Sequence, residues 1–333
     1  MLSTDDMVPP RAVSYAVAMN RPLRGIARRL VLRLTMLAAA AVLLIVAATF
    51  PYDVDKPLTA AELTRNRNYY AEAYRKETPA VEQPASEFDT RYVRIAARAA
   101  EAHHIDRQVA EFVAQYGLRD GAMLDIGSGR GYLQDVVENY TGLDISSSVG
   151  RFYHKRFVLG SATAMPIADN SFDGGWSIWV LEHVPNPEQA LAEMRRVMKN
   201  NAVFFWYPAW NCRPWFAQGY QVRPYSDFPW KGKLVKASIP LRDSEAFLGV
   251  ERVSIRSLRR AASWFGPTRL HYRLLEPNYK VYWQGDSDAL NDIDRYEAML
   301  WFRSRGDECL NCQGADGSVA QSGTAALVIR IHK

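Results

Sequence analysis

Short apolar runs alternate with longer amphipathic segments through the middle of the 333-residue chain. The amphipathic segments near residues 132–138 and 187–199 have the spacing of a helix with one apolar face. Because strands that alternate with helices form a parallel sheet covered on both faces, the pattern predicts an α/β fold. We predict strands at residues 122–126, 140–144, 157–159, 172–178 and 202–207, and a late strand at residues 325–331.

Helical periodicity also occurs on either side of this region. Residues 91–116 are expected to form a helix that packs against the sheet just before its first strand. Residues 51–90 mix prolines, charges and tyrosines, which indicates a linker that contains one helical piece at residues 60–76. Later in the chain, residues 269–272 and 278–283 are strand-like, and we expect a helix at residues 288–301.

Nine aromatic residues and four prolines fall within residues 206–230, so no regular element is expected there. Two interpretations stay open for this aromatic-rich insertion, which extends over about residues 206–285. It forms either a lid, pocket or interfacial patch for a flat or lipid-linked acceptor, or a small subsidiary core. Lys231, Lys233 and Lys236 suit anionic headgroups or a phosphorylated substrate, or they form a solvated face.

Positive charge is concentrated in a basic N-terminal arm, residues 1–29. The whole chain has a formal net charge of +5, and residues 1–33 contain six arginines and two aspartates. The nearly neutral remainder argues against a nucleic-acid partner, which would require a basic face.

The arm is followed by an apolar run at residues 30–50. About 20 apolar residues suffice to cross a bilayer as a helix, so we predict a single-pass transmembrane or membrane-anchor helix there. A cleaved signal peptide and a buried core helix are the alternatives. Residues 91–333 then form the main folded domain.

A glycine-rich turn follows the first predicted strand. Gly127, Gly129 and Gly131 have G-x-G-x-G spacing, and they allow a tight turn and a close approach of the backbone to a ligand. Asp144 ends the next strand, where it can accept two hydrogen bonds from a ribose diol. A dinucleotide fingerprint requires G-x-G-x-x-G instead, and Asp125 at the strand end suits a cationic ligand better than a diphosphate.

Four ordered blocks between residues 91 and 208 resemble those of class I S-adenosylmethionine-dependent methyltransferases of the type 11 family. They are residues 124–133, 160–173, 181–187 and 193–199. The resemblance implies a Rossmann-like, doubly wound, mostly parallel seven-stranded sheet with an antiparallel edge strand at residues 325–331, here preceded by an N-terminal hydrophobic helix. It also implies S-adenosyl-L-methionine as the cofactor.

The same resemblance implies roles for individual residues. The Gly127–Gly129–Gly131 turn and Asp125 would surround the methionine end of the cofactor, and Asp144 would hold the ribose. Ile145 and Ala162 would contact the adenine beside Ser161. The family usually has an acidic residue where Ser161 stands, so the contact there would come from a hydroxyl or a backbone group.

The acceptor side has no comparable motif, because methyl transfer depends mainly on positioning and requires a base only when the acceptor loses a proton. Glu182 and His183 follow the fourth strand and are the candidate catalytic residues, with the imidazole as proton acceptor. The alternative is that His183 caps the turn and Glu182 binds backbone amides.

We predict no metal site. Asp286 and Asp288 have D-x-D spacing, but capping of the helix expected at residues 288–301 by Ser287 or Asp286 explains this spacing more simply. Cys309 and Cys312 have the spacing of half a zinc site or of a redox pair, and two ordinary thiols are favoured because no second C-x-x-C occurs.

The sequence thus predicts a membrane-tethered methyltransferase with a small-molecule or lipid-linked acceptor. The positive-inside rule would send the domain after residue 50 across the membrane, away from cytoplasmic S-adenosylmethionine. Either the apolar run enters one leaflet, or the charge rule fails here, or the domain binds another ligand. We favour a catalytic domain on the cytoplasmic side. The alternative function is a non-catalytic scaffold or nucleoside-binding sensor at the membrane.

Overall fold

The computed structural model describes residues 21–49, 59–75, 91–312, 318–320 and 323–333. The chain divides into two compact units, Met1–Phe50 and Pro51–Lys333. The described residues of the first unit form the helix α1 (Arg21–Thr49), whose described side chains are exposed. Within the described residues, no helix combines the length and apolarity needed to cross a membrane, so the spanning helix predicted at residues 30–50 is not supported. Most of the basic arm lies outside the described residues.

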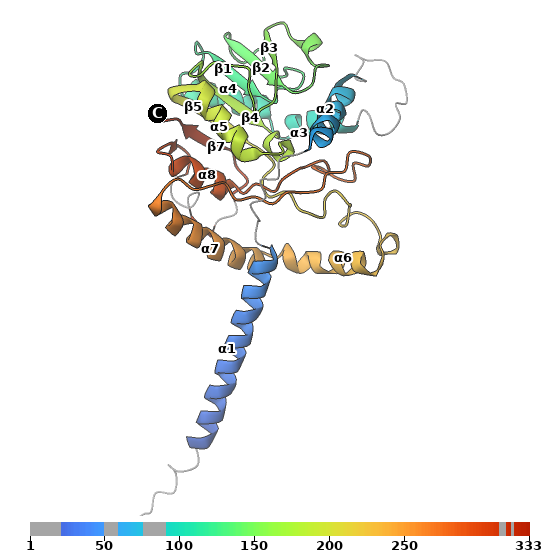
Figure 1. Cartoon of the computed structure of the whole chain (residues 1–333), viewed down its shortest axis with the longest axis vertical. Helices are drawn as coiled ribbons and strands as arrows, with labels where there is room; N and C mark the ends of the chain where they lie inside the picture. The colour runs from blue at the N-terminus through green and yellow to red at the C-terminus, as the bar shows by residue number, and fades with distance from the viewer. Residues whose placement is uncertain (1–20, 50–58, 76–90, 313–317, 321–322) are drawn as a thin grey trace, which may run out of the picture. The chain divides into compact units, whose positions relative to one another are not determined.

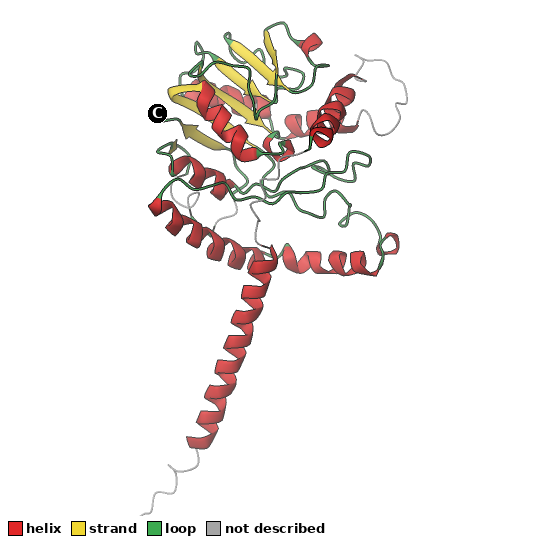
Figure 2. Cartoon of the chain, in the orientation of Figure 1, coloured by secondary structure: helices red, strands yellow, loops and turns green. Residues whose placement is uncertain are grey.

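The second unit is built on a seven-stranded mixed sheet with the order β3-β2-β1-β4-β5-β7-β6 (Figure 2). The first five strands are parallel, and the last two are antiparallel. The strands are β1 (Met123–Ile126), β2 (Tyr140–Asp144), β3 (Arg156–Leu159), β4 (Phe172–Ile178), β5 (Met198–Tyr207), β6 (Glu308–Cys309) and β7 (Leu327–Arg330).

The predicted parallel strands are confirmed within four residues at either end. The late strand β7 is antiparallel as expected, but it is not the edge strand. It lies between β5 and the two-residue strand β6, which forms the edge and was not predicted. A strand of two residues has too few positions to show a period of two, so its sequence carried no signal.

Helices cover both faces of the sheet (Figure 1). Successive side chains of β5 point to opposite faces of the sheet, so neighbouring residues of this strand pack in two different hydrophobic cores. Phe204 packs in the core that contains Leu191 of α5 (Pro187–Val197), and Phe205 packs in the other, with Phe112 of α4 (Ile105–Gln115). The other α-helices among the described residues of this unit are α2 (Ala60–Arg75), α3 (Arg91–Ala102), α6 (Trp230–Arg242), α7 (Glu245–Ala262) and α8 (Arg295–Arg303).

Several predicted helices differ from the structure. The helix expected at residues 132–138 is absent and is replaced by successive turns, such as the bond from the Gln134 amide to the Gly131 carbonyl. Only 13 residues separate β1 from β2, and the Gly131 backbone has a φ of 69°, which is not helical. The helix expected at residues 91–116 is broken by His104, whose φ is 49°.

The helix expected at residues 288–301 begins later, at Arg295, and Asp294 caps it by accepting from the Tyr296 amide. Neither Asp286 nor Ser287 therefore caps this helix, and the prediction that one of them does is wrong. The strand-like segments at residues 269–272 and 278–283 form no strand, and the nearby pairing is a single bridge between Leu274 and Asn291.

The aromatic-rich insertion is partly helical, because α6 and α7 occupy its centre. Before these helices, Trp215 and Phe228 are buried, and the ring of Tyr220 stacks on Phe228 at 4.5 Å. This packing favours the subsidiary core over the lid. Cys309, in the edge strand β6, is joined to Cys312 by a disulfide, so the prediction of two ordinary thiols is wrong.

Candidate functional site

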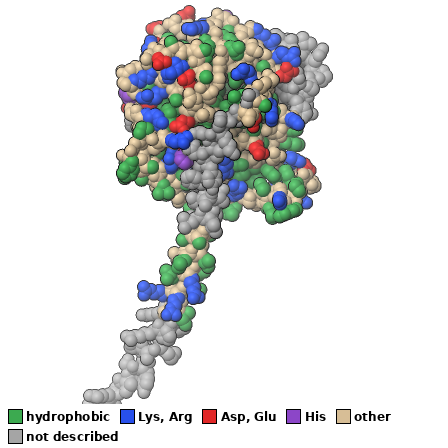
Figure 3. Space-filling view, viewed as in Figure 1, with side chains coloured by type: hydrophobic (Ala, Val, Ile, Leu, Met, Phe, Trp, Pro, Cys, Tyr) green, Lys and Arg blue, Asp and Glu red, His purple; other side chains and the backbone are tan. Residues whose placement is uncertain are grey.

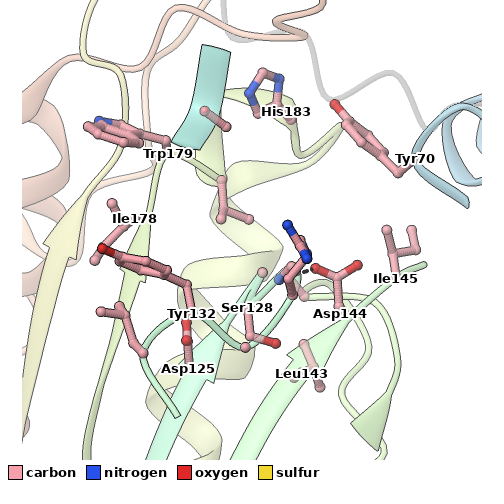
Figure 4. Close-up of a pocket in the computed structure, with 18 of the residues that line it drawn as sticks. Tyr70, Asp125, Ser128, Tyr132, Leu143, Asp144, Ile145, Ile178, Trp179 and His183 are labelled. Atoms are coloured by element: carbon pink, nitrogen blue, oxygen red, sulfur yellow. Dashed lines mark hydrogen bonds between the residues drawn. The ribbon is translucent and has the colours of Figure 1, made fainter. Parts of the chain in front are cut away.

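A cavity of about 620 Å³ opens beside the carboxyl ends of β1, β2 and β4, as Figure 4 shows. Open α/β sheets bind their ligands at this edge, and small-molecule sites have volumes of about 300–1,000 Å³. All eight predicted cofactor-binding residues line the cavity: Asp125, Gly127, Gly129, Gly131, Asp144, Ile145, Ser161 and Ala162. His183 lines it as well, whereas Glu182 lies behind its wall.

The glycine-rich turn fits closely against its neighbours. Gly127 has a φ of 73°, and a Cβ atom there would lie 2.2 Å from Cγ2 of Val180. At Gly129, with a φ of 50°, a Cβ atom would lie 2.8 Å from the hydroxyl of Tyr74. Both the backbone conformation and the available space therefore require glycine. The absence of side chains lets the turn pack directly against Val180 and Tyr74 in the wall of the cavity.

Asp144 is held by the backbone that surrounds it. Its Oδ2 accepts a hydrogen bond from the Gly129 amide at 2.8 Å, and its Oδ1 accepts one from the Ser146 amide at 2.8 Å. Burial raises the pKa of this carboxyl above its usual value, although the two amides oppose the shift. Each oxygen keeps a second lone pair, so the fixed carboxylate can still accept from a diol.

Asp125 lies at the end of β1, where it is 5% exposed. Burial raises its pKa to about 7, and the hydroxyl of Tyr140, which donates to Oδ2 at 2.8 Å, opposes this shift. A buried carboxyl of this kind becomes fully ionised when a cation binds beside it. The site therefore suits a ligand with a positively charged amino group.

Three further side chains complete the wall of the cavity, and all come from α2, in the segment expected to be a linker. Asn66, Tyr70 and Tyr74 line it. Their spacing of four residues places them on one face of a helix, and this spacing was the signal in the sequence. The helix is fastened by Arg151, which donates to the Tyr74 carbonyl at 2.9 Å. No residue of the described insertion lines this cavity.

The other end of the cavity is formed by His183, Trp179 and Tyr70, which Figure 4 shows opposite Asp125 and Ser128. His183 directs Nδ1 toward Oδ2 of Asp288 at 3.5 Å and Nε2 toward Oε1 of Glu182 at 3.8 Å. The hydroxyl of Tyr70 donates to the same oxygen of Asp288 at 3.1 Å. Neither Asp286 nor Asp288 was predicted to take part in the site.

Burial raises the pKa of Glu182 to about 7, although the charge of His183 opposes the shift. Burial alone would lower the pKa of His183, but the negative charges of Asp288 and Glu182 outweigh it and raise that pKa. Perturbed groups of opposite sign in the wall of a cavity are typical of functional sites. The backbone amides of Glu182 itself and of Ala209 also oppose the rise in the pKa of Glu182, but neither carboxylate oxygen has a hydrogen-bond partner by distance and angle among the described residues.

Comparison with known proteins supports the resemblance to methyltransferases that the sequence of this part of the sheet shows. Residues 124–206 match the family described as "Methyltransferase domain", type 11. The chain is 37% identical to the demethylmenaquinone methyltransferase of Renibacterium salmoninarum over 23% of this chain and 36% of the relative. It is 30% identical to the ubiquinone/menaquinone biosynthesis C-methyltransferase of Cupriavidus taiwanensis over 38% of this chain and 60% of the relative.

A third relative is the sterol 24-C-methyltransferase ERG6B of Gibberella zeae, which is 32% identical over 32% of this chain and 34% of the relative. The chain thus spans between a third and about three fifths of the length of these relatives. A solved structure described as a methyltransferase, possibly for histamine, from Thermotoga maritima is similar with a TM-score of 0.37 and 16% identity, over 72% of this chain and 95% of that one.

The glycine-rich turn, the carboxylate that ends β2 and the ordered blocks matched by the family lie in one continuous region of the sheet. Residues 124–206 therefore match the methyltransferase domain of class I S-adenosylmethionine-dependent enzymes.

Proposed function

We propose that the protein transfers a methyl group from S-adenosylmethionine to a small-molecule acceptor. The observation that carries this proposal is the position of Asp144, whose two oxygens are fixed by backbone amides beside the glycine-rich turn in one cavity. The cavity suits the cofactor in size, because its volume of about 620 Å³ lies in the range of small-molecule sites. The bound sulfonium supplies an activated methyl group.

In this proposal Asp144 binds the ribose, and Ile145, Ser161 and Ala162 contact the adenine. Asp125 and the turn from Gly127 to Gly131 hold the methionine end. Equilibrium dialysis with radiolabelled S-adenosylmethionine tests the proposal. We expect micromolar binding, competition by S-adenosylhomocysteine and none by NADH. A folded protein that binds neither adenosyl compound would contradict it.

The acceptor is proposed to be apolar and lipid-linked. Tyr132, Trp179 and Phe152 line the cavity, so a flat or isoprenoid group would find aromatic surface there. The names of the relatives point in the same direction, since they refer to demethylmenaquinone, ubiquinone/menaquinone biosynthesis and sterols. The alternative of a non-catalytic scaffold or sensor is not favoured, because these named relatives are methyltransferases.

We further propose that the protein works at a membrane surface that carries anionic lipids, on its cytoplasmic side, where S-adenosylmethionine is made. Trp230, Leu234 and Leu241 are exposed on α6, and their spacing places them on one face. Trp264 and Phe265, which follow α7, are 78% and 89% exposed. Figure 3 shows hydrophobic side chains gathered along the edge that α6 and α7 form.

Charge supports the same proposal. Lys231 and Lys233 are exposed on either side of the apolar face of α6, where they would meet anionic headgroups. The helix of the first unit also combines exposed apolar side chains with basic residues. Leu30, Leu34 and Leu37 are exposed on α1, whose sequence contains Arg29 and Arg33. Exposed apolar side chains flanked by basic groups are typical of helices that lie at a lipid interface.

Glu182 and His183 are proposed to handle the proton of the acceptor. His183 lines the cavity, but both of its ring nitrogens are directed toward carboxylates rather than into the open space. An imidazole that acted as a simple base would have to present one nitrogen to the acceptor.

A further inference from the structure

Four side chains with metal-binding atoms converge behind the wall that His183 forms. Ligand atoms of Glu182, His183 and Asp286 all lie within 4.8 Å of one another. Asp288 stands next to them, with Oδ2 at 3.5 Å from Nδ1 of His183. Atoms that share an ion at about 2.1 Å lie roughly 3–4 Å apart, so small side-chain movements would close this cluster on a cation.

Glu182 is the observation that points to a ligand. It is 0% exposed, and neither of its oxygens has a hydrogen-bond partner within the described part of the chain. Its Oε1 faces Nε2 of His183 at 3.8 Å, which is too long for a hydrogen bond. A buried carboxylate without partners is costly, and native structures retain such groups only with compensation.

Charge in the cluster is unbalanced. Glu182, Asp286 and Asp288 supply three carboxyl groups, and Asp288 is also 0% exposed with an unpartnered Oδ1. The ion pairs of the described residues bring no lysine or arginine to any of the three, and His183 is the basic group that they share. When all three carboxyl groups are ionised, a single imidazolium balances one of them. A divalent cation would neutralise the remaining two.

The orientation of His183 fits a metal ligand. A histidine that binds a metal through one ring nitrogen usually donates the other N–H to a carboxylate, which fixes the ring. Here Nε2 faces Glu182, and Nδ1 faces Asp288, whose Oδ2 also accepts from Tyr70 at 3.1 Å. Asp288 therefore stands where the outer carboxylate of such a site is found, Glu182 stands on the ligand side, and Asp286 lies within reach of both Glu182 and His183.

We propose that Glu182, His183 and Asp286 bind a divalent transition-metal ion at the acceptor end of the cavity, with Asp288 as the residue that positions the histidine ring. One imidazole with two carboxylates favours Mn²⁺ or Zn²⁺ over Mg²⁺ and Ca²⁺, which prefer oxygen ligands alone. The ion would lie against a wall of the cavity. There it would lower the pKa of an acceptor hydroxyl without requiring His183 to rotate.

The site is tested with metal alone, so the result does not depend on the acceptor or on S-adenosylmethionine. The full-length protein is stripped with EDTA and titrated with MnCl₂ and ZnCl₂, followed by calorimetry and by the EPR signal of Mn²⁺. We expect one ion per chain with micromolar affinity, and at least tenfold weaker binding of MgCl₂. No binding at millimolar metal by the folded protein would overturn the proposal.

Glu182→Gln and Asp286→Asn are expected to weaken binding at least tenfold. Glu297→Gln is the matched control, because Glu297 is also buried but pairs with Arg259 outside the cluster. Equal binding by all the variants would place the metal elsewhere and overturn the assignment. S-adenosylmethionine titrations of the same samples report the donor site separately.

Thermal unfolding distinguishes a ligand from a merely structural carboxylate. In EDTA, Glu182→Gln is expected to melt above the wild-type protein, because it removes an uncompensated buried charge. With saturating Zn²⁺ the order is expected to reverse, since only the wild-type protein gains the binding energy. The same order in both conditions would contradict a role for Glu182 as a ligand.

Discussion

Tyr70 in α2 donates a hydrogen bond to Asp288, 218 residues later in the sequence, over 3.1 Å. This bond joins the helix that precedes the methyltransferase region to the loop that follows the insertion. Ser146, beside Asp144, donates in turn to the Tyr70 carbonyl at 3.5 Å. The donor half and the acceptor half of the cavity are thus tied together through one residue of α2.

Removing the hydroxyl of Tyr70 tests this connection. Tyr70→Phe is expected to lower the free energy of unfolding by ~1 kcal/mol, because it leaves a buried oxygen of Asp288 with one partner fewer. Denaturant unfolding measures the change. Tyr225→Phe is the control, since Tyr225 is 48% exposed. Equal stabilities for the two variants would mean that the Tyr70 bond contributes nothing.

The close packing of the glycine-rich turn predicts that a side chain at Gly127 impairs both stability and cofactor binding. Gly127→Ala is expected to destabilise the protein by ~1–3 kcal/mol and to abolish S-adenosylmethionine binding, because its Cβ would overlap Val180 and its φ is positive. Gly249→Ala in α7 is the control. A Cβ there meets nothing within 4 Å, so this variant should gain ~0.5–1 kcal/mol from helix propensity. Thermal melts and calorimetry measure both effects, and a Gly127→Ala protein that binds normally would contradict the close fit.

The carboxyl of Asp125 predicts a dependence on pH. Burial raises its folded pKa to about 7 from the ordinary value of 3.8, so the native state holds more protons than the unfolded state between about pH 4 and pH 7. Stability from this group therefore falls as the pH rises through that window. Asp125→Asn should be more stable than the wild-type protein at pH 8, and the difference should disappear near pH 4. Unfolding curves at the two pH values check the sign.

The same residue predicts how binding changes with pH. If ionised Asp125 faces the amino group of S-adenosylmethionine, affinity should fall as the pH drops below about 7. The fall should be absent in Asp125→Asn, which binds weakly at all pH values. Calorimetric titrations from pH 6 to pH 8 measure it. A wild-type affinity that is flat across this range would contradict the contact.

The exposed side chains after α7 predict binding to lipid. Full-length protein should sediment with phosphatidylglycerol-rich vesicles and much less with pure phosphatidylcholine. The double substitution Trp264→Ser, Phe265→Ser should weaken vesicle binding about tenfold, since it removes two of the most exposed apolar groups. Leu159→Ser removes an exposed leucine on β3 and serves as the control. Vesicle binding that is unchanged in the double variant would contradict the proposed surface.

The donor half of the site was predictable because its chemistry imposes local sequence requirements. Gly127 and Gly129 must be glycine for conformational reasons, and Asp144 ends the next strand. β1 and β2 are buried along their whole length, and β1 stands out as an apolar run interrupted only by Asp125. The residues that surround the donor half therefore lie within one short, readable stretch, from Asp125 to Ala162.

The acceptor half was not predictable, because tertiary contacts assemble it from distant segments. Tyr70, His183 and Asp288 are brought together by the packing of α2 and of the loop before α8, and no spacing in the sequence links them. The D-x-D pair was assigned to a helix cap, but Asp294 provides that cap instead. The turns after Gly131 were predicted to be a helix, because their apolar residues have helical spacing. That spacing is present in the sequence even where the backbone cannot form a helix.

The most direct test of the account is calorimetric titration of the full-length protein and its Asp144→Ala variant with S-adenosylmethionine. Asp307→Asn is the matched control, because Asp307 is equally buried but pairs with Arg195 away from the cavity. The account predicts micromolar binding by the wild-type protein and by the control, and at least a hundredfold loss in Asp144→Ala. Undiminished binding by a folded Asp144→Ala protein, or no binding by the wild type, would contradict the assignment of this cavity to the methyl donor.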